Sequence, residues 1–172
     1  MVQEPEHPVA KLAKEAVERY VRDGEVLRSE PVTPEMKGRA GVFVSIHKHG
    51  ELRGCIGTFE PTRKDVAEEI ISNAISSATH DPRFRAVAPQ ELAGLDYSVD
   101  ILTSPKPVKD EGELDPRRFG IIVESGWRRG LLLPDLEGVD NVQQQIEICR
   151  SKAGIGPDEP VRLYRFEVMR YR

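Results

Sequence analysis

The chain has 172 residues, and its 25 Lys and Arg against 29 Asp and Glu give a formal net charge of −4. That length makes about one domain, and 38% hydrophobic residues suffice for a core, which excludes an intrinsically disordered protein. The longest apolar runs, such as 131–133, fall far short of the roughly 20 residues that cross a bilayer. The acidic balance argues against a general nucleic-acid binder, which needs a basic footprint.

The cysteine content indicates the redox environment. The two cysteines, Cys55 and Cys149, provide neither a disulfide framework nor a zinc ligand set. The first residues lack the basic and apolar segments of a secretory signal. We therefore expect a cytoplasmic protein with reduced thiols, and the residues indicate no metal site and no cofactor.

The first half of the chain carries clear helix and hairpin signals. Gly24 is the expected stop of the first helix, the pair His49-Gly50 is a turn signal between two β-branched runs, and Thr62 is the expected cap of the second helix. Pro82 follows the second helix and ends it. In chain order, we predict a helix over 7–23, a hairpin of strands 41–48 and 52–59, a helix from about 62 to 79, a helical turn over 89–93 and a strand over 95–102.

The second half continues the same alternation of hairpins and helices. It predicts an exposed connection over 104–118, a second hairpin of strands 119–124 and 127–133, a helix over 139–153 and a final strand over 161–171. Hairpins and helices in this order indicate an α+β fold with mainly antiparallel sheet rather than a parallel doubly wound sheet.

The segment 52–59 is the densest candidate for chemistry. Gly54 and Gly57 weaken a strand, which a sequence tolerates where another backbone or a ligand comes close. Arg53 and Cys55 are two residues apart, so we expect both side chains on one face, where the guanidinium stabilises a thiolate. Gly57, next on that face, would leave room in front of the sulfur. The alternative is that Cys55 is a small buried hydrophobe, the usual state of a free cysteine.

The register of the first hairpin decides whether His47 can act on this thiol. With His49 and Gly50 as the central turn residues, Val44 faces Cys55 and His47 points to the opposite face. Only a β-bulge that shifts the register by one residue would bring His47 to the thiol as a base.

The sequence His-Asp-Pro-Arg-Phe after the second helix gathers a base, an acid and a cation. His80 and Asp81 would form an acyl-transfer set with Cys55 only if the three met in space. The alternative is helix termination, with His80 at the negative helix end and Phe84 packed down. We expect Asp81 and Arg83 to line the same cleft as Cys55.

A group of arginines offers a third candidate, a surface for phosphate or nucleic acid. The 6% aromatic content and the negative net charge weigh against nucleic-acid binding, and a solvated turn is the alternative interpretation. The residues concerned are Arg117, Arg118, Arg128 and Arg129.

Four segments resemble the AMMECR domain family in the same order: 41–48, 52–59, 81–84 and 130–134. The last third of the chain is similar to its prokaryotic branch, AmmeMemoRadiSam system protein A, and the resemblance covers about residues 9–171. It implies one α+β domain of two lobes, which we place at about 1–103 plus 160–172 for the larger and about 104–159 for the smaller. It also implies a Memo-like protein and a radical SAM protein as partners, without a settled activity.

Together these observations predict an enzyme or enzyme component that uses the thiol of Cys55 on a small molecule or a protein. Arg53 is expected to orient an anionic group and stabilise the thiolate, and Asp81 completes the predicted catalytic set. The predicted binding residues are Gly54, Gly57, Arg83 and Phe84. The alternative is a non-catalytic module that docks a partner, such as the Memo-like protein, in the same groove, because no complete acid–base–nucleophile set is evident.

Overall fold

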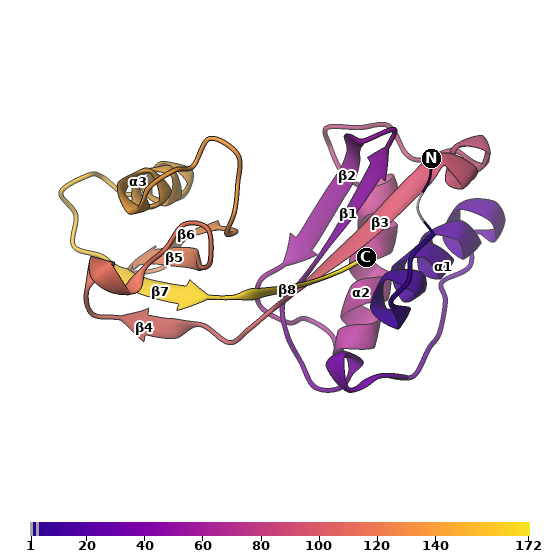
Figure 1. Cartoon of the computed structure of the whole chain (residues 1–172), viewed down its shortest axis with the longest axis horizontal. Helices are drawn as coiled ribbons and strands as arrows, with labels where there is room; N and C mark the ends of the chain where they lie inside the picture. The colour runs from indigo at the N-terminus through magenta and orange to yellow at the C-terminus, as the bar shows by residue number, and fades with distance from the viewer. Residues whose placement is uncertain (1, 3) are drawn as a thin grey trace. The chain divides into compact units, whose positions relative to one another are not determined.

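The computed structural model of the chain describes residue 2 and residues 4–172, arranged in two compact units (Figure 1). The first unit runs to Leu102 and includes Met169–Arg172, and the second unit is Thr103–Val168. Each unit is built on a four-stranded sheet with helices, which confirms the predicted α+β class. Among these residues, none of the helices combines the length and apolar character that a bilayer crossing requires.

The sheet of the first unit, which we call sheet A, has the strand order β2-β1-β3-β8. Its strands are β1 (Val42–Lys48), β2 (Glu51–Thr58), β3 (Leu95–Leu102) and β8 (Val168–Tyr171). The predicted β1–β2 hairpin is confirmed, and its two turn residues, His49 at φ 53° and Gly50 at φ 80°, are both left-handed. That backbone matches a type I′ turn, whose twist suits a tight hairpin.

Helices α1 (Pro8–Asp23) and α2 (Val66–Thr79) cover one face of sheet A (Figure 1). Val42, Val44 and Ile46 of β1 point to these helices and are fully buried, whereas the residues between them are half-buried. Alternate residues of a strand lie on opposite faces, so the residues between them belong to the other face, which we call the open face.

The ends of the two helices show ordinary capping, and at one of them the cap differs from the predicted residue. Gly24, at φ 69°, ends α1 as predicted. Helix α2, however, begins at Val66, and its cap is Asp65, whose carboxylate accepts a hydrogen bond from the Glu68 N–H at 2.9 Å. The predicted cap Thr62 lies one turn too early, because Asp65 is itself a favourable cap residue and is followed by Glu68 at the third helical position.

Thr62 instead serves a buried carboxylate on α2. Glu69 is 1% exposed and accepts hydrogen bonds from the hydroxyls of Thr58 and Thr62 and from the backbone N–H groups of Thr62 and Arg63, at 2.6–2.9 Å. Burial alone would raise the pKa of Glu69, but these hydrogen bonds outweigh it and lower the pKa below its usual value. The charged side chain therefore fixes the end of β2 and the loop that follows it onto α2.

We expect Glu69→Gln to destabilise the protein by about 2–3 kcal/mol, because an amide N–H₂ would face donors that need an acceptor. Urea unfolding followed by far-UV circular dichroism measures the change. Glu68→Gln is the matched control: that side chain is 40% exposed and pairs with Lys64, so its loss should cost less than about 1 kcal/mol. Equal losses in the two variants would contradict the role assigned to Glu69.

The second unit is built on sheet B, with the strand order β4-β7-β5-β6. Its elements are β4 (Lys106–Val108), β5 (Gly120–Ser125), β6 (Arg128–Leu132), α3 (Val142–Ala153) and β7 (Arg162–Phe166). The short 3₁₀ helices of the chain are η1 (Pro34–Met36), η2 (Pro89–Gly94) and η3 (Glu111–Glu113). Cys149 of α3 is fully buried among apolar side chains, and this burial raises the pKa of its thiol to about 12.

Two predicted segments differ from the structure in the second half of the chain. The expected connection 104–118 contains β4, a short strand at the edge of sheet B. The single strand predicted over 161–171 is two strands, β7 and β8, which belong to different sheets. The predicted larger lobe includes 160–172, whereas β7 pairs with β4 and β5 and lies in the second unit. An alternating pattern shows only that a chain is extended, not which sheet it joins.

Candidate functional site

A β-bulge in the first hairpin sets the geometry around Cys55. Ser45 lies opposite Cys55, and His47 lies opposite Leu52, which leaves Arg53 as an extra residue on β2. Residues directly opposite each other on neighbouring strands share a face of the sheet. Cys55 therefore lies on the open face with Ser45 and His47.

This bulge overturns the register that the turn alone predicts. Val44 lies opposite Ile56 rather than opposite Cys55, and the shift by one residue is the condition under which His47 reaches the face of the thiol. The turn signal locates the tip of the hairpin. A bulge residue further along the strand cannot be recognised from the sequence, because the glycines of this strand already interrupt the alternation of apolar and polar residues.

Cys55 is held by its backbone and by its sulfur. Its N–H donates to Asp81 Oδ2 at 2.9 Å, and its carbonyl accepts from Arg83 Nη2 at 3.3 Å. Because β2 is an edge strand of sheet A, Asp81 and Arg83 take the place of a further strand at this position. The sulfur accepts a hydrogen bond from Ser45 Oγ at 3.3 Å, and Cys55 is half-buried. The geometry thus fixes the residue while part of its surface stays accessible.

Asp81 is a positioning residue in this structure. Its side chain is 2% exposed, and besides the Cys55 N–H it accepts from the Nε, the Nη2 and the backbone N–H of Arg83 at 2.8–3.0 Å. These hydrogen bonds from Arg83 hold the pKa of Asp81 well below its usual range, so it is a carboxylate at neutral pH. These contacts do not give Asp81 the catalytic role predicted for it, because its carboxylate binds the backbone of Cys55 and not the thiol.

The cation beside Cys55 is Arg83. Its side-chain hydrogen bonds to Asp81 raise the pKa of its guanidinium, and the nearby Cys55 adds to that rise electrostatically. The side chain of Arg83 is 57% exposed and passes 5.5 Å from the centre of the Phe84 ring. Of the predicted binding residues, Arg83 and Phe84 therefore lie together, and Arg83 reaches the backbone of Cys55.

Arg53 takes a different direction from the predicted one. The bulge removes it from the regular alternation of β2, and its guanidinium binds both carboxylate oxygens of Glu91, at 3.1 and 3.2 Å, and the carbonyl of Arg85 at 2.8 Å. No hydrogen bond joins this guanidinium to the sulfur of Cys55 within the part of the chain that the structure describes. Its predicted role as the group that stabilises the thiolate is therefore replaced by an ion pair that fixes the bulge.

Glu91 is a site residue that sequence reasoning missed. It accepts hydrogen bonds from Arg53, from the Ala88 N–H and from Lys48, and these lower its pKa to about 2. The available signal was local: Pro89 opens a helical turn, and a glutamate at its third position is typical of a capping box. Its pairing with Arg53 spans 38 residues and leaves no local signal.

The two glycines of β2 are explained by packing. A Cβ atom at Gly54 would lie 2.1 Å from the backbone oxygen of Ser77 on α2, and one at Gly57 would lie 2.2 Å from the ring of Phe43. The predicted space in front of the sulfur at Gly57 is therefore filled by Phe43. A glycine in a strand often marks a place where another backbone or a ligand comes close. At Gly54 the group that comes close is the backbone of α2 and not a ligand.

Two polar residues of α2 insert between the strands of the hairpin. Ser77 Oγ lies 2.8 Å from the carbonyl of Val44 and accepts from the Ile56 N–H at 2.8 Å. Asn73 Nδ2 donates to the carbonyl of Val42 at 2.9 Å. Both side chains are almost fully buried. Polar residues within the apolar stripe of α2 were the sequence signal for them.

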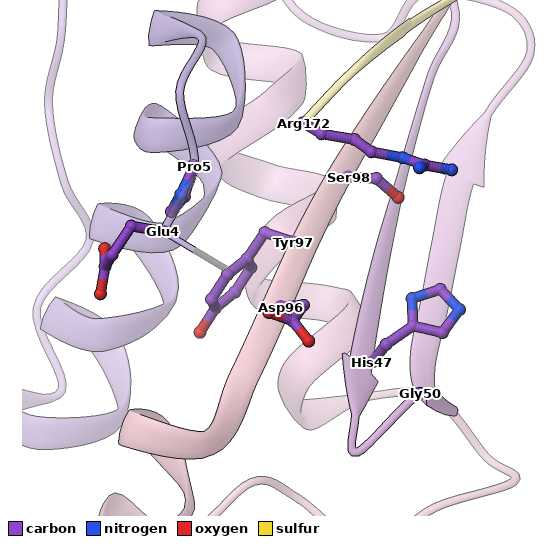
Figure 2. Close-up of a pocket in the computed structure, with 8 residues that line it drawn as sticks. All are labelled: Glu4, Pro5, His47, Gly50, Asp96, Tyr97, Ser98 and Arg172. Carbon is purple, nitrogen blue, oxygen red and sulfur yellow. The ribbon is translucent and has the colours of Figure 1, made fainter. Parts of the chain in front are cut away.

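A pocket of about 250 Å³ lies on the first unit beside the row that contains Cys55 (Figure 2). It is lined by Glu4, Pro5, His47, Gly50, Asp96, Tyr97, Ser98 and Arg172. Ser98 lies directly opposite Ser45, and Asp96 lies directly opposite His47. Cys55 does not line this pocket, but Ser45 lies between Cys55 and Ser98 across three neighbouring strands.

The remaining candidates do not join this site. His80 is the exposed C-terminal cap of α2, with its Nδ1 2.7 Å from Thr79 Oγ1, which fits helix termination. Among the candidate arginines, three are in ion pairs: Arg118 with Glu167, Arg128 with Glu159 and Arg129 with Glu124. Within residues 2 and 4–172, no three His, Cys, Asp or Glu side chains are grouped so that they could hold a metal ion.

The fold and the site define an α+β protein of two antiparallel sheets with a half-buried cysteine on an edge strand, which a buried aspartate and its arginine partner hold through the backbone of the cysteine. The chain belongs to the AMMECR1 family, whose sequence model matches residues 10–171, and this confirms the resemblance drawn from its motifs.

Relatives and a solved structure extend this finding. A protein of Thermotoga maritima is 53% identical over 171 residues, which cover 97% of this chain and 98% of the relative. Protein CA_C1420 of Clostridium acetobutylicum is 46% identical over 168 residues, which cover 96% of this chain but 36% of that longer protein. The crystal structure of the uncharacterized protein PH0010 from Pyrococcus horikoshii matches with a TM-score of 0.83 and 32% identity, covering 94% of this chain and 88% of that one.

Proposed function

We propose that this AMMECR1-family protein is an enzyme, or a component of one, in which the sulfur of Cys55 acts as the nucleophile. The observation that carries the proposal is the immobilised cysteine: its N–H, its carbonyl and its sulfur each have a partner, supplied by Asp81, Arg83 and Ser45. Catalytic groups need a supporting shell that holds them within a fraction of an ångström, and this arrangement supplies one.

The neighbours of Cys55 have distinct roles in this proposal. The hydroxyl of Ser45 points its proton at the sulfur and favours negative charge there. Arg83 brings a positive charge to the same residue. Asp81 and Arg53 act as positioning residues, because their charged groups hold the backbone and the bulge rather than the thiol.

The family resemblance adds partners and a compartment to the proposal. We place the protein in the cytoplasm, where thiols stay reduced, and we expect it to act with a Memo-like protein and a radical SAM protein. The substrate is a small molecule or a protein that presents an electrophilic centre to the open face of sheet A.

Alkylation by iodoacetamide, with the modified residue identified by mass spectrometry, tests the proposal. We expect the folded protein to be labelled at Cys55 and not at the buried Cys149, and Ser45→Ala to slow labelling of Cys55 by about threefold to tenfold, because one hydrogen bond to the charged sulfur is lost. Ser29→Ala, on a surface segment, is the control and should leave the rate unchanged. A folded protein whose Cys55 resists alkylation would contradict the proposal.

A second function is favoured by the openness of the site. Cys55 lies on a sheet face and does not line the neighbouring pocket, which also suits a surface that docks a partner protein. Co-purification with the Memo-like protein separates the two functions. Retained binding with lost activity in Cys55→Ser supports chemistry, whereas a Cys55→Ser variant that keeps both, beside an Arg53→Ala variant that loses both, supports a docking module.

A further inference from the structure

The pocket beside Cys55 brings together hydrogen-bond donors from two strands and from the residue that follows a third. His47 lies on β1, Ser98 on β3, and Arg172 directly follows β8. Figure 2 shows the side chains of these three residues around the pocket, with the guanidinium of Arg172 extended across the view above the imidazole of His47. Within residues 2 and 4–172, none of these three side chains has a hydrogen-bond or ion-pair partner.

The acidic residues of the pocket already have partners. Glu4 forms an ion pair with Lys14, and Asp96 has an interaction partner of its own. The hydroxyl of Tyr97, which also lines the pocket, is buried and has no hydrogen-bond partner among the described residues. The accessible polar side chains that remain for a ligand are therefore the guanidinium of Arg172, the imidazole of His47 and the hydroxyl of Ser98. This combination matches the oxygen atoms of a carboxylate or a phosphate, because a guanidinium forks onto two oxygens while the others each supply one further hydrogen bond.

The spacing of the sheet relates this pocket to the sulfur. Neighbouring strands lie about 4.8 Å apart, and two residues along a strand span about 6.7 Å. His47 is one strand and two residues away from Cys55, and Ser98 is two strands away in the same row. Both backbone positions are therefore roughly 8–10 Å from that of Cys55, a separation that a small molecule of a few carbon atoms spans.

We propose that this pocket binds the anionic end of the substrate, a carboxylate or phosphate group, while the electrophilic end of the same molecule reaches Cys55. Arg172 supplies the charge, and His47 and Ser98 fix the orientation of the anion. This inference rests on the proposed thiol function, and it restricts the substrate to small anionic electrophiles or to an anionic group at the reactive end of a larger molecule.

Three methanethiosulfonate reagents of different charge test the inference. The Cys55 thiolate attacks the divalent sulfur of each reagent, which carries the variable group; the bond from that sulfur to the sulfonyl sulfur breaks, a mixed disulfide forms and methanesulfinate leaves. The sulfonatoethyl reagent carries a negative charge, the trimethylammonioethyl reagent carries a positive charge at nearly the same distance, and the methyl reagent is neutral and reports accessibility of the thiol alone. Mass spectrometry assigns the modified cysteine, with Cys55→Ser as the blank.

We expect the negative reagent to label Cys55 faster than the positive one, each rate being divided by that for a free thiol. Arg172→Met should lower this ratio about tenfold, and His47→Gln and Ser98→Ala about twofold to fivefold each. Arg19→Met removes the same charge from the exposed surface of α1 and should change the ratio less than twofold. Inorganic phosphate and acetate, added separately, should slow the negative reagent, and the stronger competitor identifies the preferred anion.

The outcomes separate the two proposals. If the neutral reagent labels Cys55 but the charge ratio is the same in wild type and Arg172→Met, the anion pocket is wrong and the thiol function stands. If the neutral reagent does not label Cys55 in the folded protein, the thiol function is wrong and the inference falls with it. Circular dichroism of Arg172→Met shows that any loss of preference is not a loss of fold.

Discussion

Gly54→Ala is expected to destabilise the protein by about 3 kcal/mol or more, at the upper end of the cost of overpacking. The added Cβ would lie 2.1 Å from the backbone oxygen of Ser77, and backbone on a packed helix cannot turn aside as a side chain can. Relief requires α2 to move away from β2, which would also strain the hydrogen bonds of Ser77 to Val44 and Ile56.

Two other glycines make this prediction a graded series. Gly57→Ala meets the ring of Phe43, a side chain that can shift, so we expect a smaller loss of about 1–3 kcal/mol. Gly94→Ala has nothing within 4 Å of the new Cβ and should be neutral or stabilising by about 0.5 kcal/mol. The single tryptophan, Trp127, lies in the second unit, so urea unfolding should be followed by far-UV circular dichroism rather than fluorescence. Equal stabilities of the Gly54 and Gly94 variants would refute the close contact.

The elements that the sequence predicts well are those with local causes. The turn pair His49-Gly50 and the glycine stop at Gly24 act through the backbone conformation of one or two residues, and the structure places all three in the left-handed region. The apolar stripes of α1 and α2 likewise need no partner to be recognised.

What the sequence could not supply depends on contacts between distant residues. The bulge at Arg53 is stabilised by Glu91, and the backbone of Cys55 by Asp81, over separations of 38 and 26 residues. The alternation of apolar and polar residues along one strand does not reveal either contact. The register predicted from the turn therefore placed His47 on the wrong face of the sheet. The same limit explains the final strand, whose pattern runs on through Glu167 although Thr103 binds the backbone there and separates β7 from β8.

The sequence draws attention to Cys55 as a candidate, but it shows only part of what surrounds that residue in the fold. Cys55 was found because a cysteine between two glycines in a strand is locally unusual. Ser45 and Ser98 carry no such mark, since each is a polar residue on the open face of an ordinary strand, and only the register of sheet A brings them into one row with the thiol. Arg172 follows β8 and joins Ser98 only as part of the lining of the pocket. Asp81 and Arg83 were identified, but their role followed only from the edge position of β2.

Asp81→Asn is expected to destabilise the protein by about 2–4 kcal/mol at pH 7. The change leaves a buried amide where four hydrogen bonds end on a carboxylate, and it deprives the Arg83 guanidinium of its counter-charge. Glu25→Gln, an exposed carboxylate of the same unit, is the matched control and should change stability by less than about 0.5 kcal/mol. Similar losses in the two variants would contradict the role of Asp81 in holding the backbone of Cys55 and the guanidinium of Arg83.

The same carboxylate predicts a pH dependence with a definite sign. The hydrogen bonds from Arg83 lower the pKa of Asp81 in the folded protein below its unfolded value of about 3.9. A depressed native pKa contributes stability that is fully present above the unfolded value and is lost as the pH falls through the native one. The stability difference between wild type and Asp81→Asn should therefore be constant from pH 7 to about pH 5 and shrink at lower pH. A difference that grows on acidification would be the opposite sign and would exclude an ionised Asp81.

Hydrogen exchange distinguishes the loss of the hydrogen bond between Asp81 and the Cys55 amide from a general loss of stability. The Cys55 N–H of β2 faces outward from sheet A, and Asp81 is its acceptor. In Asp81→Asn, under conditions where the protein stays folded, the Cys55 amide should exchange at least tenfold faster than in wild type, while the Ile56 amide, held by Ser77, should keep its protection relative to the global stability. If both amides change in parallel, Asp81 contributes only to global stability.

If the Cys55 amide alone is released, the thiol should also lose its fixed position. Its alkylation rate should then become insensitive to Ser45→Ala, because the sulfur no longer stays within reach of that hydroxyl.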